Sequence, residues 1–250
     1  MADAATVPVS PTTGRSSIAR PTIQAPPLTP GKVAIWLFLA TEIMFFTGLI
    51  GTYIVLRAGS PPAAYSNLYP PATDLSRIVK EKPAGLVVTD WPRPYDRAMN
   101  PLSIDLTAVN TFILICSSVT MVLGLSAFQR DDRRRGALYV TATMAIGAVF
   151  LGVQVYEYRQ LMFGHPYPVG VSASGHFTPD VSLFASCFFT MTGFHGAHVA
   201  AGVIALGLLS IRSWSGAYSA TNHSPVELVG LYWHFVDLVW IILFTVVYLI

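Results

Sequence analysis

Five continuous apolar stretches restrict what this chain can fold into more than any other feature. Each is long enough to cross a hydrocarbon core of about 30 Å, which takes about 20 helical residues. Inside lipid the backbone must satisfy its own hydrogen bonds, and runs that do not alternate in polarity favour helices over barrel strands. We therefore expect an all-α fold, an integral membrane bundle of five transmembrane helices. The predicted helices span residues 33–56, 106–128, 136–156, 181–211 and 226–250.

Composition supports a membrane protein and excludes several other classes. Hydrophobic residues make up 53% of the chain and charged residues only 11%, which is more apolar than a soluble core of this size requires. The formal net charge of +2 is small and the basic residues are dispersed along loops, so we do not expect nucleic acid as a partner. Cys116 and Cys187 both lie inside apolar runs, where we expect packing residues and no disulfide.

The segments outside the helices divide the chain into a tail, a membrane domain and one long loop. Residues 1–32 contain no apolar run, so we predict a disordered cytoplasmic tail, with the first helix acting as the insertion signal. Residues 33–250 form the predicted membrane domain. Its 57–105 segment is rich in proline and charge, which predicts a solvent-exposed outer loop, with a separate folded module as the alternative.

Positive charge predicts the orientation of the bundle. A tight arginine cluster at 130–135 falls on the same predicted side as Arg15, Arg20, Lys32 and Arg212. Because cytoplasmic loops carry an excess of Lys and Arg, we expect a multi-pass protein with a cytoplasmic amino terminus and an outward-facing carboxy terminus.

Ionisable residues within the predicted helices are the candidate functional residues, because such groups are costly at membrane depth. His195 and His198 are three residues apart, as are His234 and Asp237, so each pair shares a helical face. At about 1.5 Å per helical residue, most of these four and Glu42 fall in one buried layer. The set comprises Glu42, His195, His198, His234 and Asp237.

Structural and functional interpretations of these residues both stay open. The two helix-four histidines lie beside small residues that let a partner helix approach and satisfy the imidazoles. His234 and Asp237 are equally compatible with hydrogen bonds across helices. For Glu42, surrounded by apolar residues, we predict a role in proton handling or lipid contact, because a lone carboxylate is costly to ionise there.

Two further glutamates lie near predicted helix ends. Glu157 follows the third helix, where we expect an interfacial anchor solvated by water and headgroups. Glu227 begins the fifth helix, seven residues before His234 and on nearly the same face.

Motifs for metal binding and covalent catalysis are absent from the sequence. It contains no paired Glu-x-x-His, no HExxH, no closely spaced Cys pair, no phosphate-binding Gly-rich loop and no Gly-x-Ser-x-Gly. We therefore predict no catalytic residue and no metal site in this chain.

Five blocks of sequence resemble, in the same order, subunit III of haem-copper terminal oxidases of the cytochrome c oxidase type. They cover nearly everything from residue 33 onward except the long loop. The blocks are WLFLATEIMFFTGLIGTY, MNPLSIDLTAVNTFILICSSVT, LGVQVYEYRQLMF, FFTMTGFHGAHVAAG and LYWHFVDLVWIILF.

The resemblance implies a noncatalytic subunit of a respiratory complex in the bacterial inner (cytoplasmic) membrane. Such a subunit holds no haem or copper, which belong to its partners, and docks on catalytic subunit I in a complex that also contains subunit II. It is expected to stabilise the catalytic subunit, bind phospholipid and support proton uptake. This chain would then be part of an oxidoreductase without carrying a redox centre itself.

The resemblance extends to single residues. Glu42 matches the glutamate of the SE-x-x-FF block, the one associated with carbodiimide labelling. His195 and His198 match the GFHG-x-H pair, Glu157 matches the YE pair, and residues 233–237 match the WHFVD block. Long family members have two more helices before the first one here, so this chain is similar to the five-helix bacterial form with an extended first loop.

Two alternatives remain at this point. The third subunit of a quinol oxidase or a nitric oxide reductase complex has the same bundle, because other subunits select the electron donor and acceptor. A stand-alone proton-coupled carrier would use the same buried residues, but such proteins often contain inverted repeats and broken helices, and we find no repeat across the five runs.

Overall fold

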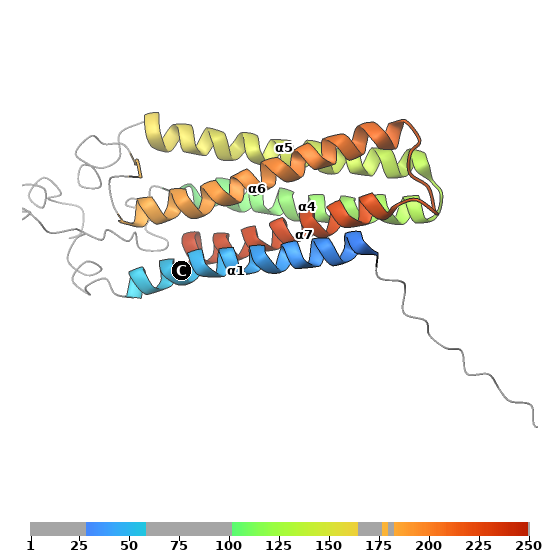
Figure 1. Cartoon of the computed structure of the whole chain (residues 1–250). Coiled ribbons are helices and arrows are strands. Elements are labelled where there is room, and N and C mark those ends of the chain that lie inside the picture. Colours follow the sequence, from blue (N-terminus) through green and yellow to red (C-terminus); the bar gives the residue numbers. More distant parts are fainter. Residues whose placement is uncertain (1–28, 59–101, 165–176, 180–182, 250) are drawn as a thin grey trace, which may run out of the picture.

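The computed structural model describes residues 29–58, 102–164, 177–179 and 183–249 (Figure 1). Within these ranges the chain is helical and has no strand, which confirms the predicted all-α class. Five helices are long and apolar enough to cross a membrane. They are α1 (Pro30–Ala58), α4 (Ile104–Gln129), α5 (Arg133–Phe163), α6 (Leu183–Trp214) and α7 (Ser224–Phe244), the last continued by a π-helical turn, η1 (Thr245–Leu249).

Most of the helices are longer than the sequence predicts, most clearly at the end of α5. This helix was expected to stop at Tyr156 but continues to Phe163. Beyond the apolar stretch, Glu157 and Leu161 stay buried on the same face as Gln154, so packing rather than hydropathy sets the end. Most of the predicted tail (1–28) and of the predicted outer loop (59–101) lies outside the described residues.

The four carboxy-terminal helices form a closed ring, with α4 beside α5, α5 beside α6, α6 beside α7 and α7 beside α4. Helix α1 lies outside this ring against α6 and α7 (Figure 1). The start of α1, the α4–α5 turn and the α6–α7 loop are at the same end of the bundle. Lys32, Arg212 and the 130–135 arginine cluster therefore share one end of the molecule.

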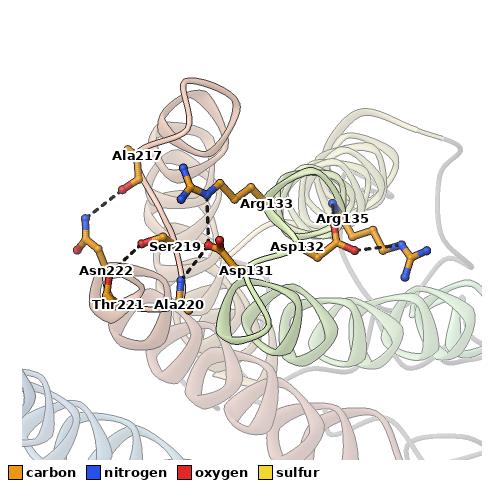
Figure 2. Close-up of polar contacts among 9 residues, drawn as sticks. All are labelled: Asp131, Asp132, Arg133, Arg135, Ala217, Ser219, Ala220, Thr221 and Asn222. Carbon is orange, nitrogen blue, oxygen red and sulfur yellow. Dashed lines mark hydrogen bonds and ion pairs between the residues drawn. The ribbon is translucent and has the colours of Figure 1, made fainter.

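The α4–α5 turn is fastened to the α6–α7 loop at this end (Figure 2). Asp131 has a φ of 59°, a left-handed conformation that Asp tolerates better than most residues. Its Oδ1 accepts hydrogen bonds from Arg133 Nε and from the Ala220 backbone N–H, both at 3.3 Å. Asp132 caps α5 by accepting from the Arg135 N–H at 3.1 Å. The hydrogen bond between Asp131 and Ala220 thus joins the α4–α5 turn to the α6–α7 loop.

Trp233 of α7 lies between α5 and α6, and both helices pack against its indole ring. A Cβ added at Gly147 would lie 2.5 Å from Trp233 Cη2, and one added at Gly202 would lie 2.8 Å from its Cε3. Glycines at these two positions give the indole its space between the helices. Large apolar side chains on the outer surface, such as Met44, Phe112 and Ile211, are exposed, as expected of helices that face lipid.

Candidate functional site

Glu42 of α1 and His198 of α6 meet across the interface between α1 and the ring. Glu42 Oε2 lies 2.9 Å from His198 Nε2, and both side chains are largely covered, with 16% and 20% of their area exposed. Glu42 lies on the inward face of α1, between Leu39 and Phe46, because residues three and four apart share a helical face. Among the five candidate residues of the predicted buried layer, Glu42 and His198 form a hydrogen bond with each other.

The hydrogen bonds of His198 restrict where its protons lie. Its Nδ1 is 2.7 Å from the Phe194 carbonyl oxygen, which can only accept, so Nδ1 carries a proton. Its Nε2 then either accepts a proton from a neutral Glu42 or donates one to the Glu42 carboxylate. In both forms one proton lies between the two residues, so the pair can hold a proton without leaving an unpaired charge.

Aromatic side chains surround the Glu42–His198 pair. The rings of Phe46 and Phe45 lie 5.2 and 6.3 Å from the His198 ring, centroid to centroid. Tyr232 of α7 donates its hydroxyl to the His198 carbonyl at 2.9 Å. The two phenylalanine rings cover the His198 ring, and the Tyr232 hydrogen bond joins α7 to the backbone of α6.

His195 points into the four-helix ring, and the Phe46 ring of α1 also approaches it edge-on at 6.5 Å, centroid to centroid. It is fully buried and stacks on Trp240 with a centroid distance of 4.8 Å, while the Phe150 ring approaches edge-on at 6.2 Å. Neither ring nitrogen has a hydrogen-bond partner among the described residues. His195 and His198 therefore lie in different environments although they are three residues apart.

Asp237 of α7 bonds to α4 and not to Glu42. The Ser118 hydroxyl donates to Asp237 Oδ2 at 2.5 Å, whereas Oδ1 has no partner within the described part of the chain. His234 is half-buried one turn away, close enough to interact electrostatically with Asp237. The candidate residues are thus divided between the α1–α6 contact, the centre of the ring and the α4–α7 contact.

A row of hydroxyls on α4 is a feature that the sequence reasoning missed. Trp240 Nε1 donates to Thr111 Oγ1, and Trp233 Nε1 donates to Ser117 Oγ, each at 2.9 Å. Both hydroxyls in turn donate to carbonyls of their own helix. The signal was present in the sequence, because Thr107, Thr111, Ser117 and Ser118 recur along an otherwise apolar run.

The prediction for Glu157 as a solvated anchor is wrong, because its side chain is buried, with 7% exposed. Glu157 Oε1 accepts hydrogen bonds from Thr107 of α4 at 3.1 Å and from Tyr248 of η1 at 3.4 Å. This carboxyl joins three elements, and the continuation of α5 past Tyr156 is the reason it is covered. Glu227, in contrast, forms a surface ion pair with Lys32 at 2.9 Å.

Within the residues that the structure describes, no group of three or more His, Cys, Asp or Glu side chains could hold a metal ion. Two cysteines in these ranges, Cys116 and Cys187, are free thiols. The ionisable residues are instead paired, stacked or bonded to hydroxyls. Such an arrangement can hold and orient protons.

Comparison with known proteins gives consistent matches over most of the chain. The family model described as cytochrome c oxidase subunit III matches residues 82–250. Cytochrome c oxidase subunit 3 of Thermostichus vulcanus is 33% identical over 219 residues, which cover 87% of this chain and 86% of the relative. That of Alkalihalophilus pseudofirmus is 30% identical over 217 residues, covering 87% and 85%. Cytochrome bo(3) ubiquinol oxidase subunit 3 of Pseudomonas aeruginosa is 30% identical over 217 residues, covering 86% and 82%.

Proposed function

Because the chain belongs to the cytochrome c oxidase subunit III family, we propose that it is the non-redox subunit of a respiratory haem-copper terminal oxidase. The complex reduces dioxygen to water and pumps protons, as part of aerobic electron transport. The haem and copper belong to the partner subunits, which is in keeping with the lack of a metal-ligand cluster among the described residues.

The partners and the membrane follow from this function. Catalytic subunit I and subunit II are the proposed protein partners, and the location is the bacterial inner membrane. The amino terminus faces the cytoplasm, an orientation supported by the arginine cluster, Lys32 and Arg212 sharing one end of the bundle. In the proposed division of the chain, residues 1–32 form a cytoplasmic tail, 33–250 the membrane domain and 57–105 its outer loop.

The role proposed for this chain is to stabilise the catalytic subunit and to support its proton supply. The observation that carries it is the Glu42–His198 contact, in which one proton is shared at the boundary between α1 and the ring. The Glu42–His198 pair lies beside the lipid-facing surface of α1, where phospholipid is the proposed neighbour. His195, His234 and Asp237 are proposed to be further polar residues of the bundle with a proton- or lipid-related role. Glu157 and Glu227 are proposed to position the helix ends at which they lie.

Purification of the intact complex from its native membrane tests the assignment. We expect this chain to co-migrate with subunits whose absorption spectrum shows haem, and with copper by metal analysis. A chain that purifies alone and catalyses substrate uptake would overturn the assignment and support a carrier.

Glu42→Gln tests the proton role within the assembled complex. The amide keeps the shape of the side chain and its contact with His198 but cannot take up or release a proton. We expect normal assembly and initial turnover, with faster loss of activity during sustained turnover. Thr41→Val, on the neighbouring exposed position, is the matched control and should leave the lifetime unchanged. An unchanged lifetime in Glu42→Gln would remove Glu42 from the proposal.

A quinol-oxidising complex is the second candidate, because one relative is named as a subunit of a ubiquinol oxidase. The electron donor is selected by other subunits, so the same bundle serves either complex. Oxygen consumption by the purified complex with reduced cytochrome c, compared with a quinol, separates the two.

A further inference from the structure

Three buried polar side chains inside the ring carry atoms that lack a hydrogen-bond partner among the described residues. These atoms are Asn110 Oδ1, Gln154 Oε1 and both ring nitrogens of His195. The residues come from α4, α5 and α6 and are 4%, 6% and 0% exposed. Such groups are costly to bury unpaired, so three of them in one region point to a bound molecule.

Contacts around one turn of α5 place the three side chains in the same region. Asn110 Nδ2 donates to the Phe150 carbonyl at 3.3 Å, one turn before Gln154. Gln154 Nε2 donates to the Thr192 carbonyl at 3.0 Å on α6. A Cβ added at Gly196, next to His195, would lie 3.2 Å from Gln154 Oε1, and the Phe150 ring contacts the His195 ring edge-on.

The orientation of both amides is fixed by these contacts. A backbone carbonyl can only accept, so the nitrogen of each amide must face it and the oxygen must be the free atom. A neutral imidazole adds one donor and one acceptor. The region therefore contains one donor and three acceptors, so at least two of the acceptors need a donor from outside these three side chains.

We propose that this region is a buried hydration site, in which water bridges Asn110, Gln154 and His195. A water molecule can donate to Asn110 Oδ1 and to Gln154 Oε1 and accept from the imidazole N–H, which leaves only the second imidazole nitrogen of these atoms without a partner. Buried waters in proteins typically make about three hydrogen bonds to otherwise unsatisfied polar groups. A cation is a poor fit, because none of the three side chains is a carboxylate and there is a single imidazole. The hydration site ties α4, α5 and α6 together.

An electron cryo-microscopy map of the intact complex, sharp enough to show other buried waters, tests the proposal directly. We expect density within hydrogen-bond distance of Asn110 Oδ1, Gln154 Oε1 and a His195 nitrogen. The same density should be missing in His195→Phe, which keeps an aromatic ring to stack on Trp240 but removes both nitrogens. A map that resolves other buried waters but is empty here would overturn the proposal, as would a direct hydrogen bond from a His195 N–H to Gln154 Oε1.

A double-mutant cycle provides a second readout that does not depend on map quality. Asn110 and His195 share no direct hydrogen bond in the structure, so the water should make Asn110→Leu and His195→Phe non-additive in the thermal midpoint of the complex. The control pair is Asn110→Leu with Thr141→Val, because Thr141 bonds to Ser210 and Trp214 and should add independently. Additivity of the Asn110 and His195 changes would contradict the proposal. Where His195→Phe does not assemble, Gln154→Met is used in its place.

Discussion

Helix α1 and the four-helix ring are held in different ways. The ring packs around buried aromatic residues, and its polar contacts are mostly neutral hydrogen bonds, such as those from Trp233 and Trp240 to α4 hydroxyls. Along α1, in contrast, the buried residues are Leu39, Phe46 and Tyr53. The Glu42–His198 hydrogen bond joins α1 to α6, and the Lys32–Glu227 ion pair joins it to α7. Loss of either pair should therefore affect how α1 is attached more than how the ring is packed.

The largest effect on stability should come from removing the Trp233 side chain at the centre of the four-helix ring. Trp233 is 1% exposed, and Trp233→Ala should lower the free energy of unfolding by about 3–5 kcal/mol, because it opens a large cavity. Thermal denaturation of the purified complex, followed by release of this subunit, measures the change. Trp214→Ala is the control, since Trp214 is half exposed and its loss should shift the midpoint far less. Equal shifts of the midpoint in the two variants would show that the buried Trp233 contributes no more to the stability of the four-helix ring than the exposed Trp214.

The contact between α1 and the ring is the next test. Glu42→Leu and His198→Phe, each of which removes the contact, should show a coupling of about 0.5–3 kcal/mol when measured alone and together, the range from neutral hydrogen bonds to hydrogen bonds with charged groups. Denaturation midpoints of the four complexes give this value. The pair formed by Glu42→Leu and Thr143→Val is the control, because Thr143 bonds to Thr120 on the other side of the ring. Coupling near zero would mean that apolar packing alone holds α1.

Close packing within the ring predicts a third effect, which the sequence does not indicate. Gly147→Ala should destabilise the subunit by about 1–3 kcal/mol, because its Cβ would overlap the buried Trp233 ring. Gly152→Ala, on the same helix, has nothing within 4 Å of the added Cβ and should be neutral or slightly stabilising. The difference between the two midpoints is the measurement, and a neutral Gly147→Ala would show that α5 and α6 can separate around the indole.

The sequence predicts the helices well because hydrophobic length and backbone satisfaction in lipid depend on composition alone. Helical depth also placed Glu42 and His198 at a similar level, where the structure shows them bonded. The burial of Glu157 was not predictable in this way. It depends on a partner 50 residues earlier in α4 and on η1 at the carboxy terminus, and hydropathy has no information about either contact.

The smallest expected effect is at the exposed end of α1, where Lys32 pairs with Glu227. Their side chains are 27% and 31% exposed, and ion pairs in such surroundings typically contribute about 0–1 kcal/mol. Lys32→Met should therefore shift the midpoint slightly, and the shift should shrink as salt is raised, because exposed charges are screened. Glu42→Gln should respond less to salt, since its pair is better covered. If both variants lost the same stability and showed the same salt dependence, the difference in burial would have no effect on the strength of the two contacts. The attachment of α1 would then depend on surface charge along its whole length.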